Sequence, residues 1–177
     1  MRIITGIYKG RHFDVPRTFK ARPTTDFAKE NIFNVLNGYI DLEDADALDL
    51  FAGTGSISLE LVSRGCRHVT AVEADRAHHA FILRCLKTLG TDKCMAVRGD
   101  VFRYLKSCKR KYDFIFADPP YALPELPQIP AAVLDGGLLA DGGIFVFEHG
   151  KENDFSADPR FIERRVYGSV NFSIFGI

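Results

Sequence analysis

The chain has 177 residues, of which 46% are hydrophobic and 26% are charged, and its formal net charge is zero. This length and composition are typical of one globular domain and exclude a disordered, fibrous or strongly basic protein. No apolar run approaches the roughly 20 residues that span a membrane. The first residues also lack the apolar stretch of a signal peptide, so we expect a cytoplasmic protein with no membrane partner.

Residues 1–40 predict a small N-terminal extension made of a β-hairpin and a helix. Two short β-like runs, Arg2–Thr5 and His12–Val15, flank a turn. The segment Arg22-Pro23-Thr24-Thr25-Asp26 is typical of a helix start, because proline restrains the approach and threonine or aspartate can cap. Apolar residues at helical spacing then continue to Gly38, which ends the predicted helix.

The extension carries most of the basic charge imbalance. Residues 1–29 contain seven basic and two acidic residues although the whole chain is neutral. This asymmetry favours a polyanionic partner for the extension, with a solvated segment lacking any partner as the alternative. A second basic cluster follows at Lys106, Lys109, Arg110 and Lys111, where a solvated helix end explains the charges equally well.

Residues 41–177 alternate apolar strands with helices and form the predicted main domain. Strands are predicted at Ala47–Phe51, Val69–Glu73, Met95–Arg98, Phe114–Ala117, Ile144–Glu148, Phe161–Val166 and Val170–Phe175. Helices are predicted at Ser56–Arg64, Arg76–Leu89 and Val101–Ser107, and another ends at Leu134. This pattern predicts an α/β fold with a doubly wound, mostly parallel seven-stranded sheet. The last two strands flank Tyr167-Gly168-Ser169 and would form an antiparallel C-terminal hairpin.

The cysteines do not form a metal-binding pattern. Cys66, Cys85, Cys94 and Cys108 include no Cys-x-x-Cys pair, and no histidine cluster stands at ligand spacing. A structural zinc site normally needs two such pairs. We therefore expect reduced thiols and no metal.

Asp118-Pro119-Pro120-Tyr121 is the most informative segment, because it follows directly on a buried apolar strand. The prolines fix the backbone and remove donors, so that neighbouring carbonyls project rigidly beyond the strand end. Asp118 adds hydrogen-bond acceptors, and Tyr121 adds a flat face on which a ring can stack. The set suits a planar group that carries an NH₂, such as a nucleobase amine. The alternative is a loop whose prolines merely end a strand.

A second set of residues stands at the ends of the first three predicted strands of the main domain, where ligands of open α/β sheets bind. Gly53 and Gly55 allow a sharp turn and a close ligand approach after the first strand. Glu73 ends the second strand at the spacing of an acid that grips ribose hydroxyls, and Asp100 follows the third. Simple turns and helix caps are the alternative for each. A nicotinamide fingerprint would need a glycine where Ser58 stands.

Together these motifs resemble the Rossmann-like S-adenosylmethionine-dependent methyltransferases that act on exocyclic amines. The arm segments Arg2-Ile3-Ile4, Lys9-Gly10-Arg11, Arg22-Pro23-Thr24-Thr25-Asp26 and Glu30-x-x-Phe33-Asn34 narrow the match. With them, the chain resembles the bacterial 16S ribosomal RNA guanine-N2 methyltransferases of the RsmD type over roughly its whole length. The segment Leu123–Pro130, with three prolines, departs from that pattern.

The resemblance implies a role for each matched residue. Residues implied to hold the cofactor S-adenosylmethionine, or its product S-adenosylhomocysteine, are Asp49, Phe51, Ala52, Gly53, Thr54, Gly55, Glu73, Ala74, Asp100 and Val101. Residues implied to hold and activate the target base are Asp118, Pro119, Pro120 and Tyr121. Residues expected to contact RNA are Arg2, Lys9, Arg11, Arg22 and Thr24.

The expected reaction is methylation of the N2 amine of a guanine in 16S rRNA, within an assembled or assembling small ribosomal subunit, by a monomer. Asp118 and the carbonyl of Pro119 would accept the two N2 hydrogens, so that the nitrogen lone pair points at the methyl group. Alternatives on the same fold are an adenine N6 in DNA or RNA and a protein glutamine amide. A nicotinamide-dependent oxidoreductase and a non-catalytic RNA-binding module are alternatives from other classes.

Overall fold

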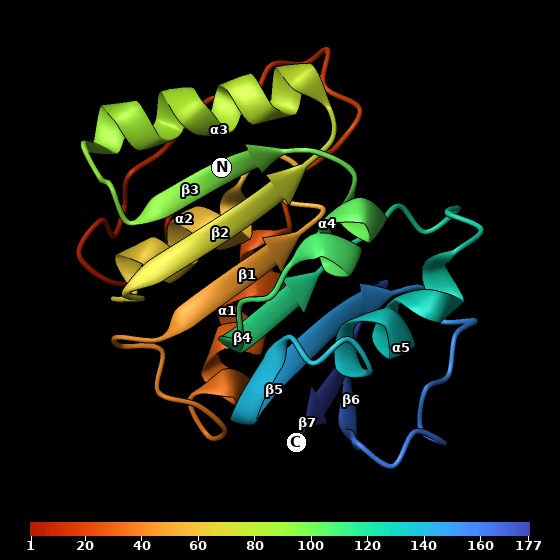
Figure 1. Cartoon of the computed structure of the whole chain (residues 1–177). Helices are drawn as coiled ribbons and strands as arrows, with labels where there is room; N and C mark the ends of the chain where they lie inside the picture. Colours follow the sequence, from red (N-terminus) through yellow and green to blue (C-terminus); the bar gives the residue numbers. More distant parts are fainter.

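The fold is organised around a mixed β-sheet of seven strands in the order β3-β2-β1-β4-β5-β7-β6 (Figure 1). The computed structural model describes all residues, 1–177. The strands are β1 (Asp46–Leu50), β2 (His68–Glu73), β3 (Cys94–Arg98), β4 (Tyr112–Ala117), β5 (Leu139–His149), β6 (Phe161–Tyr167) and β7 (Val170–Gly176). The helices are α1 (Asp26–Leu36), α2 (Ser56–Ser63), α3 (Arg76–Leu89), α4 (Val101–Ser107), the 3₁₀ turn η1 (Leu126–Gln128) and α5 (Ile129–Leu134).

The pairing of the strands confirms the predicted fold class. Strands β1 to β5 pair in parallel, whereas β7 pairs antiparallel with both β5 and β6. The α/β class, the mostly parallel seven-stranded sheet and the antiparallel C-terminal hairpin are therefore as predicted. Most predicted strand boundaries lie within one or two residues of the observed ones, but β5 begins at Leu139, five residues before the predicted Ile144. The segment Ala140-Asp141-Gly142-Gly143 lacks an apolar pattern, so nothing in the sequence indicates this early start.

Residues of the central strands alternate between two apolar layers. In β4, Phe114 and Phe116 pack with α1 and α2, whereas Ile115 and Ala117 pack with α4 and α5. Figure 1 shows α4 and α5 in front of the sheet, α1 and α2 behind it, and α3 along the edge formed by β3. Since both faces are covered, the central strands are mostly apolar on both faces, with Asp49 of β1 and Thr70 of β2 among the few buried polar residues.

The strand order reverses between β1 and β4. Strand β1 has β2 on one side and β4 on the other, although β4 follows it only after two intervening strands. Such a switch leaves a crevice beyond the carboxyl ends of the two strands. The chain leaves β1 into the glycine loop and leaves β4 into Asp118, so the two sequence motifs meet at this crevice.

The N-terminal hairpin is present but shorter than predicted. Its only β-bridge joins Arg2 and His12, and the Ile3 amide donates to the Arg11 carbonyl at 3.0 Å. Beyond Ile3, the amides of Ile4 and Thr5 donate instead to the carboxylate of Glu60, at 2.8 and 3.0 Å. This buried acid on α2 takes over the hydrogen bonds that a longer hairpin would have used.

The extension is joined to the main domain by a buried ionic cluster, hereafter the arm cluster, of Lys29, Glu60 and Arg64. The Lys29 ammonium donates to the Arg2 carbonyl at 2.6 Å and to Ser56 Oγ at 3.0 Å, and it lies 3.4 Å from Glu60. Arg64 Nε donates to Glu60 at 3.0 Å. The apolar face of α1 also belongs to the core behind the sheet. The division of the chain into an extension of residues 1–40 and a main domain of residues 41–177 stays a prediction.

Several simpler features complete the fold. All four cysteines are free thiols, with Cys66 and Cys85 buried and Cys94 and Cys108 half-buried. No helix combines the length and the hydrophobicity that crossing a bilayer requires. No group of three or more His, Cys, Asp or Glu side chains is arranged to hold a metal ion.

Candidate active site

The glycine loop after β1, residues 51–55, has the backbone of a tight ligand-binding turn. Phe51 has a positive φ of 59°, which is uncommon for a residue with a side chain, and Gly53 and Gly55 have φ of 58° and 80°. A Cβ on Gly55 would lie 3.0 Å from Ile82 of α3, so both conformation and packing require glycine there. Gly55 precedes α2 without a side-chain cap, and the Ser58 amide donates to Asp49, which leaves the amides of Ser56 and Ile57 for a ligand.

Asp49 is the penultimate residue of β1, just before this loop, and its side chain is buried. Ser58 Oγ donates to its Oδ2 at 2.6 Å. Burial raises the pKa of Asp49 to about 7, although the Ser58 hydrogen bonds oppose the shift. Sequence reasoning assigned no role to Ser58, which stands where a nicotinamide fingerprint has glycine. The sequence signal for Ser58 was a polar residue between the apolar residues Ile57 and Leu59 of the predicted helix.

Glu73 and Asp100 lie at the predicted strand ends with different surroundings. Glu73 ends β2 and is largely buried, which raises its pKa, while His78 and the backbone amides of Ala74 and Gly53 lower it. Asp100 caps α4, because its Oδ1 accepts a hydrogen bond from the Arg103 amide at 3.0 Å. The helix-cap alternative is therefore correct for this oxygen. Its neighbour Val101 is buried in the core that α4 shares with the sheet.

Asp118 stands at the mouth of the crevice. Its amide donates to the carbonyl of Leu50, at the end of β1, at 3.3 Å. Burial, the charges of Glu148 and Asp49 and a hydrogen bond with Glu148 raise the pKa of Asp118 well above its usual range. Pro119 is buried behind it, and Pro120 is exposed.

Tyr121 presents its ring to solvent while its hydroxyl is fixed. The side chain is 43% exposed, so a face remains free for stacking. Its hydroxyl donates to Oε1 of Glu148 at 2.8 Å. Glu148, near the end of β5, was not among the predicted site residues. It ends an apolar strand as Glu73 does, and the strand-end argument applied to the fifth strand would have found it.

The structure brings part of the predicted RNA-binding set to the same place. A cavity of about 70 Å³ is lined by Ala21 to Thr24 together with Asp49, the glycine loop and Asp118, so Arg22 and Thr24 adjoin the site. Arg2 lies nearby, since its carbonyl accepts from Lys29 beside Ser56, and its guanidinium pairs with Asp26 at 3.0 Å.

Lys9 and Arg11 are placed differently. Lys9 belongs to the hairpin turn, which contacts the opposite end of α2 through hydrogen bonds from Ile7 and Tyr8 to Ser63. The Arg11 side chain is exposed on the second hairpin strand. The structure therefore does not bring Lys9 to the crevice.

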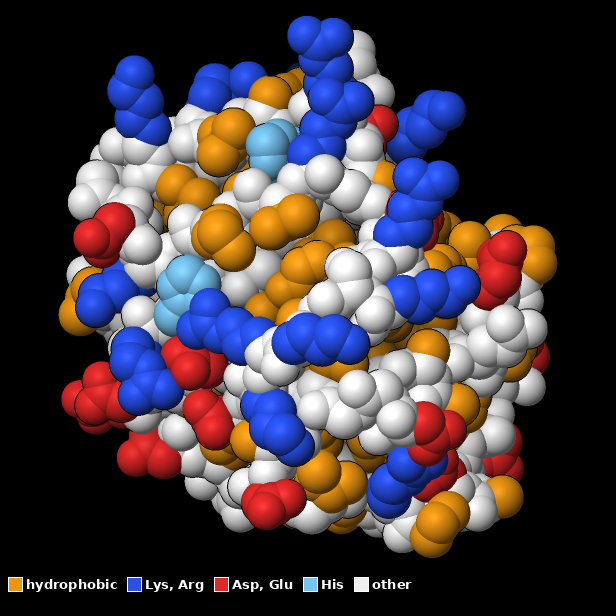
Figure 2. All heavy atoms as spheres, viewed as in Figure 1, with side chains coloured by type: hydrophobic (Ala, Val, Ile, Leu, Met, Phe, Trp, Pro, Cys, Tyr) orange, Lys and Arg blue, Asp and Glu red, His pale blue; other side chains and the backbone are white.

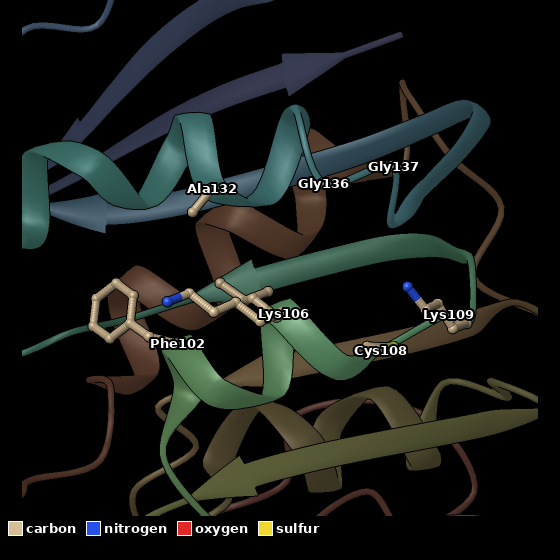
Figure 3. A pocket seen from close by; sticks show the side chains of 8 residues that line it. Phe102, Lys106, Cys108, Lys109, Ala132, Gly136 and Gly137 are labelled. Atoms are coloured by element: carbon tan, nitrogen blue, oxygen red, sulfur yellow. The ribbon is translucent and has the colours of Figure 1, made fainter.

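The second basic cluster and a groove between α4 and α5 lie on the front face. Figure 2 shows Lys and Arg side chains across this face in the region of α4 and the loop after it. Arg110 in that loop pairs with Asp46 at the start of β1, at 3.5 Å. The loop therefore lies at the amino ends of the parallel strands, whereas Asp118 lies at their carboxyl ends. A groove of about 420 Å³ between α4 and α5 is lined by apolar residues and by Lys106 and Lys109 (Figure 3). It contains none of the predicted site residues.

The chain is similar to known proteins along nearly its whole length. A family model described as "Conserved hypothetical protein 95" matches residues 1–176. Ribosomal RNA small subunit methyltransferase D of Escherichia coli is 32% identical over 99% of this chain and 89% of its own length. The protein of the same name from Haemophilus influenzae is 28% identical, over 99% of this chain and 93% of its own length.

Solved structures agree on the fold. A hypothetical protein of Thermus thermophilus superposes with a TM-score of 0.87 at 28% identity, covering 100% of this chain and 99% of that one. A 16S rRNA N2 methyltransferase from the same organism, in complex with AdoMet and guanosine, has a TM-score of 0.70 at 19% identity, covering 89% of this chain and 44% of that one. From the match along nearly its full length, the chain belongs to the Conserved hypothetical protein 95 family, the methyltransferase family that includes ribosomal RNA small subunit methyltransferase D.

Proposed function

We propose that this protein transfers a methyl group from S-adenosylmethionine to the exocyclic N2 amine of a guanine in 16S ribosomal RNA. The observation that carries the proposal is the position of Asp118-Pro119-Pro120-Tyr121 at the switch point, beside Asp49 and the glycine loop. Family membership with a ribosomal RNA small subunit methyltransferase supports the substrate class.

The residues around the glycine loop suit S-adenosylmethionine, whose sulfonium makes its methyl group electrophilic. Phe51–Gly55 offers positive-φ backbone and the free amides of α2, without side chains that would block a close approach. Asp49 is a buried acid that can accept from the amino group of the methionine part. Glu73 lies where it can accept from ribose hydroxyls, and the second oxygen of Asp100 can accept from the adenine amine.

The chain's own residues would hold and activate the base. The acceptors of Asp118 and the carbonyl of Pro119 take the two N2 hydrogens, which orients the nitrogen lone pair, and Tyr121 stacks on the ring. The base must leave its helix or loop to reach them, at a cost of a few kcal/mol in lost stacking. The guanine edge presents donors at both N1 and N2 to the acceptors of Asp118 and Pro119, whereas the adenine edge has one donor and one acceptor.

The RNA partner would approach over the extension, with Arg2, Arg22 and Thr24 nearest the crevice and Lys9 and Arg11 farther out. We expect a monomer that acts in the cytoplasm on the assembled or assembling small subunit. Charged contacts of this kind make affinity fall steeply with added salt.

A methylation assay tests the proposal. Unmodified small subunits, naked 16S rRNA, DNA and protein are incubated with methyl-labelled cofactor, and the product is identified by mass spectrometry after digestion. N2-methylguanosine from ribosomal RNA supports the proposal. N6-methyladenosine or methylated glutamine as the only product contradicts it and favours the alternative substrates.

Asp118→Ala gives the matching residue test. Turnover should fall by roughly 10²–10⁴ because the amine loses its positioning acceptor. Cofactor affinity measured by calorimetry should stay within a few-fold. The control is Asp92→Ala, which removes an exposed carboxylate on the loop before β3 and should change neither quantity. Full turnover by Asp118→Ala would remove this residue from the reaction.

A further inference from the structure

Glu148 and Asp118 form a side-by-side carboxyl pair on neighbouring strands. The parallel register of β4 and β5 aligns Ala117 with Phe147, so the next residues, Asp118 and Glu148, stand next to each other. Glu148 is 6% exposed, and its Oε1 accepts from Tyr121 at 2.8 Å. Its Oε2 is buried, and no residue besides Asp118 is placed to donate a hydrogen bond to it. Neither carboxyl pairs with a Lys or Arg side chain within 4.0 Å.

Two adjoining carboxyls in such a place share a proton. Their mutual repulsion and burial oppose double ionisation, and a proton on Asp118 supplies the donor that Glu148 Oε2 lacks. The Tyr121 and Asp118 hydrogen bonds lower the pKa of Glu148 against the effect of burial, whereas the charge of Glu148 raises that of Asp118. Because the Tyr121 hydroxyl donates to Glu148, this hydrogen bond favours the negative charge on Glu148 and the shared proton on Asp118.

Arg22 lines the same cavity as Asp118, and the other charged groups near the pair are acidic. Asp49 faces Asp118 from β1, and Glu152 lies near Tyr121 from the segment after β5. The adjacent His149 is buried and turned to other partners, Ser173 Oγ at 2.7 Å and the Gly150 carbonyl at 2.7 Å. The pair thus stands in an acidic pocket, which favours accepting a proton over releasing one.

Resting on the proposed function, we propose that Glu148 is the proton-accepting partner of the methyl transfer and acts through Asp118. Attack by N2 forms the N–CH₃ bond and breaks the S–CH₃ bond, whose electron pair stays on sulfur. The methylated nitrogen, now positively charged, gives one hydrogen as a proton to the free oxygen of Asp118. Asp118 passes its own proton to Oε2 of Glu148, and the pair changes from one negative charge to none.

This arrangement gives a reason for a buried glutamate, Glu148, next to the segment Asp118–Tyr121. A lone Asp118 carboxylate would hold the amine but would lose an acceptor once protonated. With Glu148 behind it, Asp118 keeps one oxygen on the amine and one on its partner throughout the transfer. Glu148 touches no substrate in this scheme, so it is a positioning residue that also stores the proton.

The test compares Glu148→Gln with Tyr121→Phe across pH. Glutamine preserves the shape and the acceptor for Tyr121 but leaves Asp118 as the only, weaker base, so the plateau rate should fall by roughly 10–100-fold. The acid limb of the profile should move to lower pH, because Asp118 no longer faces the charge of Glu148. Tyr121→Phe removes a hydrogen bond to the Glu148 anion, so the acid limb should move to higher pH. Unchanged acid limbs in both variants would overturn the role of Glu148.

A second measurement does not depend on turnover. Carbon-13 NMR of the side-chain carboxyls in the free protein should show Asp118 and Glu148 titrating in coupled steps, with the Asp118 step lowered in Glu148→Gln. Independent titration of the two groups alongside normal methylation would overturn the proton-accepting role. Coupled titration in a protein that methylates no RNA would instead overturn the proposed function.

Discussion

Two clusters of buried titratable side chains adjoin the crevice, the arm cluster through Ser56 and the other through Asp49 and Asp118, and their hydrogen bonding differs. In the arm cluster, the Glu60 carboxylate accepts from the Ile4 and Thr5 amides and from Arg64, and it pairs with Lys29. In the strand-end cluster of Asp49, Asp118 and Glu148, three acids adjoin without a cation, and one oxygen has no donor from any other residue. A saturated cluster holds a fold together, whereas an unsaturated one is suited to a ligand or a proton.

The largest expected effect comes from breaking the saturated cluster. Glu60→Ala leaves the Lys29 ammonium buried without its counter-ion and orphans the amides of Ile4 and Thr5. Loss of one partner of a buried pair costs about 3–5 kcal/mol. For a chain of this size each kcal/mol lowers Tm by roughly 2–4 °C, which thermal unfolding measures directly.

Glu148→Gln is the matched comparison for Glu60→Ala, because both remove a buried carboxylate. The strand-end substitution relieves repulsion and supplies an amide donor, so unfolding free energy should stay the same or rise by about 1 kcal/mol. Equal losses of stability in the two variants would contradict the distinction between a saturated and an unsaturated cluster.

An effect of intermediate size is expected in the pH dependence of the unfolding free energy, which the strand-end acids should determine. The pKa of Asp49 is about 7 in the folded protein and lies near 4 once unfolded, so the folded state binds more protons between these values. Stability therefore falls as pH rises through this window, by at most about 1.4 kcal/mol per pH unit for one group. Glu73, Asp118 and Glu148 are also shifted upward and add to the slope.

Asp49→Asn isolates the contribution of that one residue. Asparagine keeps an acceptor for Ser58 but cannot ionise, so the loss of unfolding free energy between pH 5 and pH 8 should shrink by about 2.6 kcal/mol. Urea denaturation at the two pH values measures it. An unchanged pH slope would show that Asp49 is ionised normally in the folded state.

The contrast between the clusters also marks what sequence could and could not predict. Strand ends such as Asp118 and Glu73 were found because apolar runs and turn residues fix them locally. The Lys29–Glu60 pair joins residues far apart in the chain, on two helices whose crossing no local pattern specifies. The contact between Asp118 and Glu148 depends on the register of β4 against β5, which arises from tertiary packing.

The smallest expected effect concerns the surface that the arm cluster orients. Arg22 lines the crevice, whereas Lys9 sits at the hairpin turn beside the far end of α2. If RNA enters over the crevice, Arg22→Ala should weaken RNA binding by up to about tenfold and lower the salt slope by roughly one ion. Lys9→Ala removes an equal charge and should change both quantities less. Filter-binding titrations over a range of salt concentrations compare them, and a larger loss for Lys9 would place the RNA path along the hairpin instead.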